Sequence, residues 1–291
     1  MFYSPLRYPG GKGILATFMK SAILENDLLD GTYVEPYAGG AGTALALLFE
    51  EFVHNIIIND LDRSLYAFWY SVLNFTEDLC KLINDTEVTI KEWQRQREVQ
   101  TNKERAGLLE LGYSTFFLNR TNRSGIINAG VIGGKEQKGS WKMDVRFNKT
   151  DLIRRIKKVA YYKSRISLYN LDAVELINQV IPTLPQRSLI YFDPPYYIKG
   201  KKLYVNFYSD KDHIDLYNAV TKNVPQKWVL TYDNADEILK LYQLYRPQSY
   251  KLNYSVGSIK SKGTEMMYFS SNFIIPKNID ILVKIDNNEC S

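Results

Sequence analysis

The fold of this chain is constrained most by one stretch, Leu189-Ile190-Tyr191-Phe192-Asp193-Pro194-Pro195-Tyr196. Its first four residues form an apolar run of strand length, and the two prolines stop the run immediately after Asp193. We therefore expect a buried strand whose carboxyl end holds the Asp193 carboxylate in a rigid turn. Open α/β sheets bind their ligands at that edge. Taken alone, the same residues also fit a strand-ending turn with a helix-capping carboxylate.

Three other strand-like segments also end at an acidic residue, and their order along the chain predicts the fold class. They end at Glu35, Asp60 and Asp172. Alternating strands and helical segments predict a mixed α/β, Rossmann-like sheet in which the strand ends lie along one edge. Any one of these carboxylates could simply cap a helix. A series of four, completed by Asp193, favours a binding site.

The segment after Glu35 combines a glycine-rich turn with the start of a helix. The glycines of residues 39–42 permit the close approach of a ligand, while the helix N-terminus supplies unpaired N–H groups. The turn is not G-x-G-x-x-G, which disfavours a dinucleotide, and the loop around Lys12 lacks the pattern of a phosphate-binding P-loop. Asp60 follows about 20 residues later, the separation at which an acidic residue takes ribose hydroxyls. These parts fit a nucleoside cofactor without a pyrophosphate, and S-adenosylmethionine is the candidate.

The composition indicates an ordinary globular protein of one large or two modest domains. The chain has 291 residues, 45% of them hydrophobic and 24% charged, and a core of this size needs no crosslinks. Its two cysteines, Cys80 and Cys290, have no metal-ligand spacing, so we expect a reducing compartment and no metal site. The sequence has no leader-like start and no run of about 20 apolar residues, so we expect a cytoplasmic protein without a membrane span.

The pattern changes at residue 65, where a long stretch with helical spacing and few glycines begins. It leads into a basic segment: residues 120–165 hold 13 Lys or Arg and three Asp or Glu, on a chain of net charge +5, so the rest is negative overall. Such a segment fits contact with a phosphate backbone, although a solvated charged face is the alternative. Short polar and guanidinium side chains at residues 119–128, with a returning strand within residues 139–148, predict a hairpin that reads base edges.

In these motifs the chain resembles the Dam-type (alpha-group) adenine-specific DNA methyltransferases, from Arg7 to about Asn272. The resemblance rests on elements in the family's order: Arg7-Tyr8-Pro9-Gly10-Gly11-Lys12, Glu35-Pro36-Tyr37-Ala38-Gly39-Gly40, Asn59-Asp60, Asn119-Arg120 with Gly125, Asp172, and Asp193-Pro194-Pro195-Tyr196. It implies a Rossmann-like methyltransferase sheet formed by residues 1–64 and 161–291. A mostly helical target-recognition insertion carrying the hairpin would occupy residues 65–160. Ser124-Gly125 stands where many members have Asn-Gly, so no target sequence is carried over.

The resemblance also implies a set of site residues. The catalytic turn is Asp193, Pro194, Pro195 and Tyr196. Cofactor-binding positions are Tyr8, Lys12, Glu35, Tyr37, Gly39, Asp60, Asp172 and Asp193. Positions expected to contact DNA are Arg7, Asn119, Arg120, Asn122, Arg123, Ser124, Asn128 and Lys142. The partner is then double-stranded DNA, and we expect a nucleoid-associated monomer with a cognate restriction endonuclease or a defence system as a further candidate partner.

The chemistry explains why the turn needs these residue types. The 6-amino group of adenine is a poor nucleophile, because its lone pair is delocalised into the ring. If the Asp193 carboxylate and the Pro194 carbonyl each accept one N–H, the lone pair turns toward the sulfonium methyl group. The prolines add no competing donor, and Tyr196 can stack on a base that has been flipped out of the duplex. Methyl transfer is then a direct in-line displacement without a covalent intermediate.

Two other hypotheses stay open from the sequence. An amino-methyltransferase of the same chemistry could act on the 4-amino group of cytosine or on adenine in RNA. Asp rather than Ser at position 193 favours adenine, and the insertion favours duplex DNA. From a different class, the chain could be a catalytically silent DNA-binding homologue, which the intact turn at residues 193–196, Lys12 and Asp60 disfavour.

Overall fold

The computed structural model describes residues 3–7, 13–198, 208–245, 247–256, 259–277 and 282–283. The helices are α1 (Gly13–Glu25), α2 (Gly42–Phe49), α3 (Arg63–Asn74), α4 (Thr76–Asp85), α5 (Ile90–Thr101), α6 (Leu108–Thr121), α7 (Lys149–Tyr161), α8 (Ala173–Gln179), α10 (Asp210–Asn223) and α11 (Asp236–Leu241). The strands are β1 (Gly31–Glu35), β2 (Val53–Asn59), β3 (Ile166–Tyr169), β4 (Ser188–Phe192), β5 (Lys227–Asp233), β6 (Gln248–Val256), β7 (Ile259–Phe269) and β8 (Leu282–Val283). Short 3-10 turns are η1 (Arg123–Gly125), η2 (Lys163–Arg165) and η3 (Ile181–Thr183). None of the described helices is long and apolar enough to cross a membrane.

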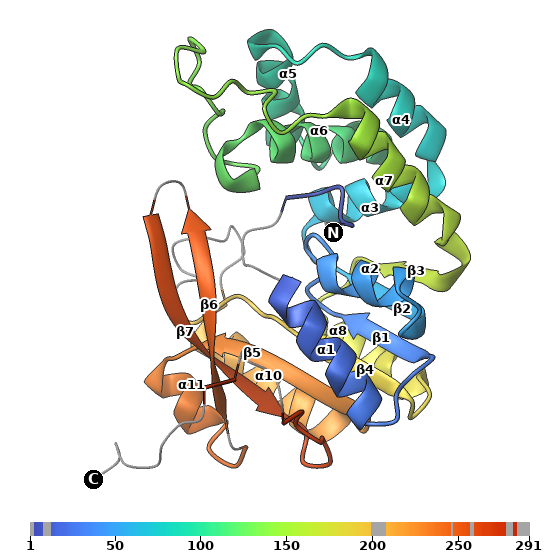
Figure 1. Ribbon diagram of the computed structural model, residues 1–291, viewed down its shortest axis with the longest axis vertical. Helices are drawn as coiled ribbons and strands as arrows, with labels where there is room; N and C mark the ends of the chain where they lie inside the picture. Colours follow the sequence, from blue (N-terminus) through green and yellow to red (C-terminus); the bar gives the residue numbers. More distant parts are fainter. Residues whose placement is uncertain are drawn as a thin grey trace.

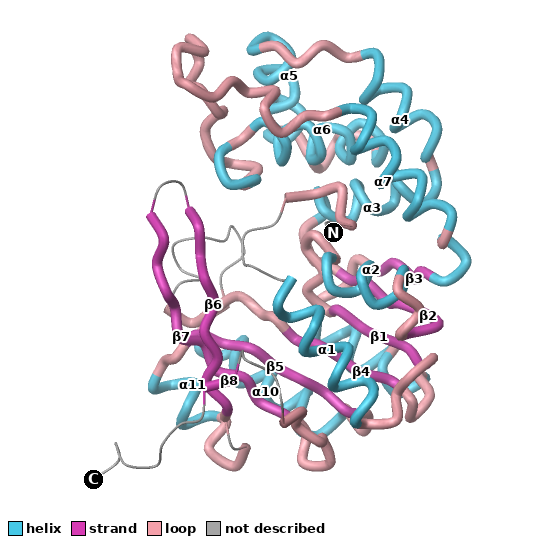
Figure 2. Tube along the Cα trace, viewed as in Figure 1, coloured by secondary structure: helices cyan, strands magenta, loops and turns pink. Residues whose placement is uncertain are grey.

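Within the described residues, eight strands form one sheet with the order β3-β2-β1-β4-β5-β7-β6-β8 (Figures 1 and 2). The first five strands in this order are parallel, and β7 is antiparallel to both β5 and β6. The order reverses between β1 and β4, which pair with Val34 opposite Ile190. Open sheets of this kind bind ligands at the carboxyl ends of the strands beside such a reversal. The Rossmann-like sheet expected from the sequence is confirmed, and Glu35 and Asp193 lie at its reversal point.

The central strands are buried on both faces because their alternate residues enter two different hydrophobic clusters. On β1, Tyr33 packs in the cluster that contains residues of α1 and α2, whereas Val34 packs with residues of α8, α10 and α11. On β4, Leu189 and Ile190 divide in the same way. Burial on both faces explains why these strands are continuous apolar runs in the sequence. The sheet therefore has a helical layer on each side (Figure 1).

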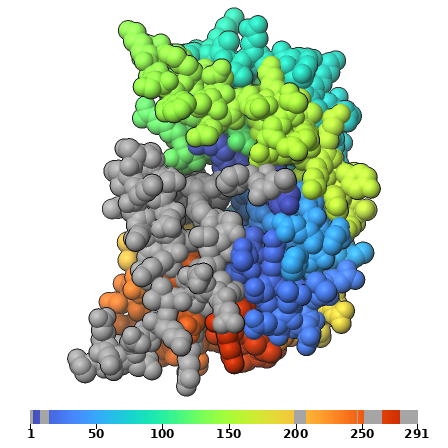
Figure 3. Space-filling view, in the orientation of Figure 1, coloured from blue at the N-terminus to red at the C-terminus, as the bar shows by residue number. Residues whose placement is uncertain are grey.

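Helices α3 to α7 lie between β2 and β3 in the chain and form the upper part of the molecule in Figure 3. Helix α6 is their centre, because residues 111–121 are all buried. Helix α3 packs along α6 and also joins the core of the sheet layer, since Phe68 and Trp69 share a hydrophobic cluster with Phe18 of α1. The division into a catalytic domain and an insertion at residues 65–160 stays a prediction, and this shared core crosses it.

The loop between α6 and α7 differs from the expected hairpin. Residues 139–148, all of which the structure describes, form turns and bends rather than a returning strand. The pairing present is a single antiparallel bridge between Asn122 and Val131. The side chain of Gln137 explains the difference, because its amide group bonds to three backbone groups within residues 132–143. These local bonds satisfy backbone groups that a strand would have paired with a neighbour.

We expect Gly112→Ala to destabilise the protein. A Cβ atom at Gly112 would lie 2.4 Å from the Ser71 hydroxyl oxygen and 2.5 Å from the Ala67 carbonyl oxygen, so α3 and α6 would have to separate. Overpacking of this kind costs about 1–3 kcal/mol of unfolding free energy, more than the roughly 0.5–1 kcal/mol that alanine gains over glycine in a helix. Gly130→Ala is the control, since a Cβ there meets open space. Urea unfolding measures both variants, and equal stabilities would contradict this packing.

Candidate functional site

The Asp193 carboxylate follows β4 and is oriented from the neighbouring strand β5. The Thr231 hydroxyl donates to Asp193 Oδ1 at 2.9 Å, and the Tyr191 hydroxyl oxygen lies 3.0 Å from Thr231 Oγ1. Because the hydroxyl hydrogen of Thr231 is used in the hydrogen bond to the carboxylate, the Tyr191 hydroxyl is the donor in the second bond. Thr231 is fully buried, so this chain of two hydroxyls holds Asp193 Oδ1 in a fixed direction.

The residues after Asp193 are held by two further carboxylates. The backbone N–H groups of residues 197–198 donate to the two oxygens of Asp233, each at 2.9 Å. The Tyr196 hydroxyl donates to Glu265 Oε2 at 2.5 Å. Burial raises the pKa of Tyr196 well above its usual value, so this hydroxyl keeps its proton and stays a donor at neutral pH. The catalytic turn expected from the sequence is thus fixed at its carboxylate, its backbone and its ring.

Sequence reasoning missed the three residues that hold this turn: Thr231, Asp233 and Glu265. Asp233 carries the same signal as the other strand-end carboxylates, an acid that closes an apolar strand, and that signal was sufficient to find it. Thr231 and Glu265 lie inside strands, and their roles depend on which strands are neighbours. That neighbourhood is a property of the sheet and not of the local sequence.

Two carboxylates at the ends of β1 and β2 shape the glycine turn before α2. Glu35 Oε1 accepts the Ala44 N–H in the first turn of α2 at 3.1 Å, and Asp60 Oδ2 accepts the Gly39 N–H at 2.9 Å. Gly39 has a φ of +48°, in the left-handed region that favours glycine. Its carbonyl oxygen accepts a hydrogen bond from Trp69 Nε1 at 2.9 Å. The turn is therefore fixed from β1, from β2 and from α3.

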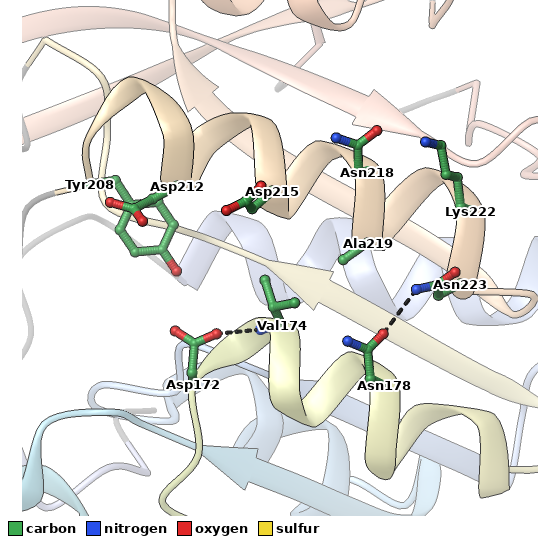
Figure 4. Close-up of a pocket in the computed structure, with 10 residues that line it drawn as sticks. All are labelled: Asp172, Val174, Asn178, Tyr208, Asp212, Asp215, Asn218, Ala219, Lys222 and Asn223. Carbon is green, nitrogen blue, oxygen red and sulfur yellow. Dashed lines mark hydrogen bonds between the residues drawn. The ribbon is translucent and has the colours of Figure 1, made fainter.

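Asp172 lies at one end of a groove between α8 and α10. Its carboxylate caps α8 by accepting the Val174 N–H at 2.8 Å. The groove has a volume of about 440 Å³, and Figure 4 shows Asp172, Val174 and Tyr208 together at this end. The Tyr208 hydroxyl lies 2.8 Å from that of Tyr37, which links the groove to the turn after β1. Burial raises the pKa values of both tyrosines, so both hydroxyls stay protonated at neutral pH.

The groups at this edge of the sheet fit a nucleoside cofactor that carries a positive charge. Glu35, Asp60 and Asp172 each accept a backbone N–H at the edge where the strands end, and carboxylate oxygens also accept hydroxyl donors such as those of a ribose. Carboxylates also attract a sulfonium centre. Tyr8 and Lys12 lie outside the described residues. Among the residues that the structure describes, no cluster of His, Cys, Asp and Glu is arranged to hold a metal ion.

Some of the residues expected to contact DNA hold the N-terminal segment against the insertion. We call this set the N-terminal clip: Arg7, Asn119, Arg120 and Asn122. The Asn119 amide accepts the Arg7 N–H at 2.7 Å and donates to the carbonyl oxygens of Arg7 and Gly125 at 2.7 and 2.8 Å. Arg120 Nε donates to the Pro5 carbonyl at 2.8 Å, and burial, with neighbouring positive charges, lowers the pKa of Arg120 to about 9. Within the clip, only the Arg7 side chain is more than 8% exposed.

The other residues expected to contact DNA lie on the surface of the loop between α6 and α7, at the upper left of Figure 1. We call residues 123–148 the basic loop. Arg123, Asn128 and Lys142 are exposed there, and Ser124 is half-buried. Further exposed cations of the loop are Lys135, Lys138 and Arg146. DNA contact stays a prediction for both sets, and surface position favours the basic loop over the clip.

The chain matches the family model described as D12 class N6 adenine-specific DNA methyltransferase over residues 8–256. It matches no curated protein. Among solved structures it is similar to a proposed RNA methyltransferase from Pyrococcus horikoshii, with 8% identity, 87% of this chain and 81% of that chain covered, and a TM-score of 0.42. It is also similar to a proposed class I S-adenosylmethionine-dependent methyltransferase from Listeria monocytogenes (10% identity, 92% and 62% covered, TM-score 0.41). The family match includes all four strand-end carboxylates first noted in the sequence: Glu35, Asp60, Asp172 and Asp193.

We expect Asn119→Ala to lower the free energy of unfolding by about 2–4 kcal/mol, because it deprives one N–H and two carbonyls of their partner. Arg123→Ala is the matched control from the exposed side of the same segment, and it should change stability by less than about 0.5 kcal/mol. Denaturant unfolding of the two variants compares them directly. If Asn119→Ala proves as stable as Arg123→Ala, the N-terminal clip does not hold the segment as described.

Proposed function

The chain belongs to the D12 class N6 adenine-specific DNA methyltransferase family, and on that premise we propose that residues 193–196 carry the reaction on a flipped-out adenine of duplex DNA. The protein is an S-adenosylmethionine-dependent methyltransferase that methylates the 6-amino group of adenine in DNA. One observation supports the proposed site above all others. The Asp193 carboxylate, held by Thr231, lies at the carboxyl end of β4, beside the reversal of strand order.

Bound S-adenosylmethionine supplies an electrophilic methyl group on a positively charged sulfur. We propose that the carboxylates after β1 and β2 and at the start of α8 bind its nucleoside part. Asp60 would accept the ribose hydroxyls, because its carboxylate is bonded to the glycine turn at the Gly39 N–H. Asp172 would lie near the adenine ring of the cofactor, at the end of the groove that Tyr208 lines. The remaining positions proposed for cofactor binding are Tyr8, Lys12, Glu35, Tyr37, Gly39 and Asp193.

Asp193 and Pro194 are proposed to act on the target amino group. Thr231 orients the Asp193 carboxylate so that it can accept one N–H of the adenine. The Pro194 carbonyl accepts the other N–H, and its position is fixed because Pro194 is buried and two successive prolines restrict the backbone. The nitrogen lone pair would then face the methyl group that bound S-adenosylmethionine supplies. The N–C bond would form as the S–C bond breaks, S-adenosylhomocysteine would leave, and the methylated amino group would release one proton to water. Orientation and electrostatics supply the main catalytic effects.

The basic loop is proposed to contact duplex DNA. Its exposed cations would neutralise phosphates, while Ser124 and Asn128 offer short polar side chains to base edges. Flipping the adenine costs a few kcal/mol, which these backbone contacts would offset. The Tyr196 ring would stack on the flipped base. We further propose that the enzyme acts as a monomer at the nucleoid, with a restriction endonuclease or a defence system as its partner.

We expect Asp193→Ala to reduce methyl transfer by at least about 100-fold, since it removes an acceptor that organises the transition state. Binding of S-adenosylmethionine and DNA should largely survive. Glu237→Ala, which removes an exposed carboxylate on α11, is the control and should keep wild-type activity. Transfer of labelled methyl groups measures the rates, and sequencing of N6-methyladenine in DNA from cells making each variant also gives the target site. Full activity in Asp193→Ala would contradict the proposed mechanism.

We expect Arg123→Ala and Lys142→Ala each to weaken DNA binding and to reduce the slope of log K against log salt by about one. The reason is that each exposed cation of the basic loop would release one counterion from the duplex. Lys240→Ala removes an exposed cation of α11 and serves as the control. Fluorescence anisotropy over a range of salt concentrations measures the slopes. Unchanged affinity and slope in both loop variants would refute the placement of DNA on this loop.

A further inference from the structure

Three residues on neighbouring strands lie in one row beside the catalytic turn. Strand β5 pairs with β7 so that Asp233 lies opposite Glu265, and β6 pairs with β7 so that Tyr250 also lies opposite Glu265. Directly opposite residues of antiparallel strands point to the same face, with Cβ atoms about 4.5–5.5 Å apart. We call Asp233, Glu265 and Tyr250 the strand row. Its geometry follows from strand register alone.

The strand row is bonded to the residues that follow Asp193. Asp233 holds the N–H groups of residues 197–198, and Glu265 Oε2 accepts the Tyr196 hydroxyl at 2.5 Å and the Tyr250 hydroxyl at 2.6 Å. Burial raises the pKa values of both tyrosines well above the usual value. Both hydroxyls therefore keep their protons and donate to the Glu265 carboxylate.

The Glu265 carboxylate is 0% exposed, which is a costly place for an ionisable group. Burying an ionisable side chain in a sheet is rarely repaid in stability, and an apolar side chain would serve a purely structural strand better. A hydrogen bond prefers a nearly linear geometry and weakens steeply away from it, so it is directional. A tyrosine side chain has only two rotatable angles, so a directional bond at its hydroxyl also fixes the plane of its ring.

We propose that Glu265 is a positioning residue that fixes the plane of the Tyr196 ring, on which the flipped adenine stacks, and that Tyr250 holds Glu265 in turn. This rests on the function proposed above, in which Asp193 and Pro194 bind the amino group of the same adenine. If the plane of the Tyr196 ring is fixed, the adenine stacked on it is held with its amino nitrogen at a constant distance from those two acceptors. Misplacement of a reacting group by about 1 Å lowers a rate by roughly 100-fold, so a small rotation of the ring is enough to matter.

Single-turnover methyl transfer and the fluorescence of a base analogue test the proposal in the full-length protein. The probe is a duplex containing the methylated site found by sequencing, with 2-aminopurine in place of the target adenine. Its fluorescence rises when it leaves the base stack and falls when an aromatic ring stacks on it. Glu265→Gln replaces the carboxyl group with an amide and keeps the shape, while Tyr196→Phe removes the hydroxyl and keeps the ring.

The matched control is Tyr162→Phe. The Tyr162 hydroxyl also donates to a glutamate, Glu51, at 3.5 Å. Glu51 lies just before β2, at the opposite edge of the sheet from the catalytic turn. The control therefore removes a hydrogen bond from a tyrosine hydroxyl to a glutamate and leaves residues 193–196 and the strand row unchanged. It should keep the wild-type rate and fluorescence.

We expect Glu265→Gln and Tyr196→Phe each to lower the single-turnover rate about tenfold at saturating DNA and to change the fluorescence of the bound probe. Affinities for DNA and S-adenosylmethionine should stay at wild-type values. The double variant should be no slower than the slower single variant, because both changes act on the same contact between Tyr196 and Glu265.

Wild-type rate and fluorescence in a folded Glu265→Gln variant would overturn the proposal, and so would losses that multiply in the double variant. A purely structural role predicts lower stability with unchanged rate and fluorescence below the unfolding temperature. If Glu265→Gln does not fold, Tyr196→Phe and Tyr250→Phe, which keep both rings, decide by the same two readouts. A wild-type protein that fails to methylate adenine, or a fully active Asp193→Ala variant, would refute the proposed function instead.

Discussion

Carboxylates at the strand ends hold the turns that follow them, and the whole site depends on these bonds. Glu35 and Asp60 hold the glycine turn and α2, Asp172 caps α8, and Asp233 holds the backbone after the two prolines that follow β4. A backbone N–H that emerges at the edge of a sheet needs an acceptor, and a carboxylate supplies one. The hydrogen bond to the turn also fixes the direction of the carboxylate. The binding roles proposed for Glu35, Asp60 and Asp172 would depend on that fixed direction.

The N-terminal clip connects two parts of the family resemblance that are far apart in the sequence. Gly125 has a φ of +76°, and a Cβ atom there would lie 2.6 Å from the Arg7 carbonyl oxygen. Asn119 bonds to both Arg7 and Gly125. The elements that begin at Arg7 and at Asn119 thus form one contact between the N-terminal segment and the start of the basic loop. Polar residue types at these positions predict DNA readout, which stays a prediction, and in the structure the same side chains bond to the N-terminal segment.

The strands were predictable from sequence because burial on both faces demands uninterrupted apolar runs, as at residues 189–192. The acids closing β1, β2 and β4 were predictable because each ends an apolar run in the sequence. The path of the basic loop was not predictable from the sequence, because it depends on the hydrogen bonds of one side chain, Gln137, to nearby backbone groups. The burial of Asn119 depends on a partner 112 residues away, and no local pattern reports such a contact.

The catalytic turn is local in sequence, but its rigidity is supplied by strands that come later in the chain. Thr231 reaches Asp193 across 38 residues, and Glu265 reaches Tyr196 across 69. These partners lie on β5 and β7, whose register places Asp233 and Glu265 opposite each other. Register changes only in whole residues, and a slip of one would turn every side chain to the other face. The groups that hold residues 193–198 therefore share one discrete arrangement, which the sheet sets, and the in-line transfer proposed for this turn would require that kind of preorganisation.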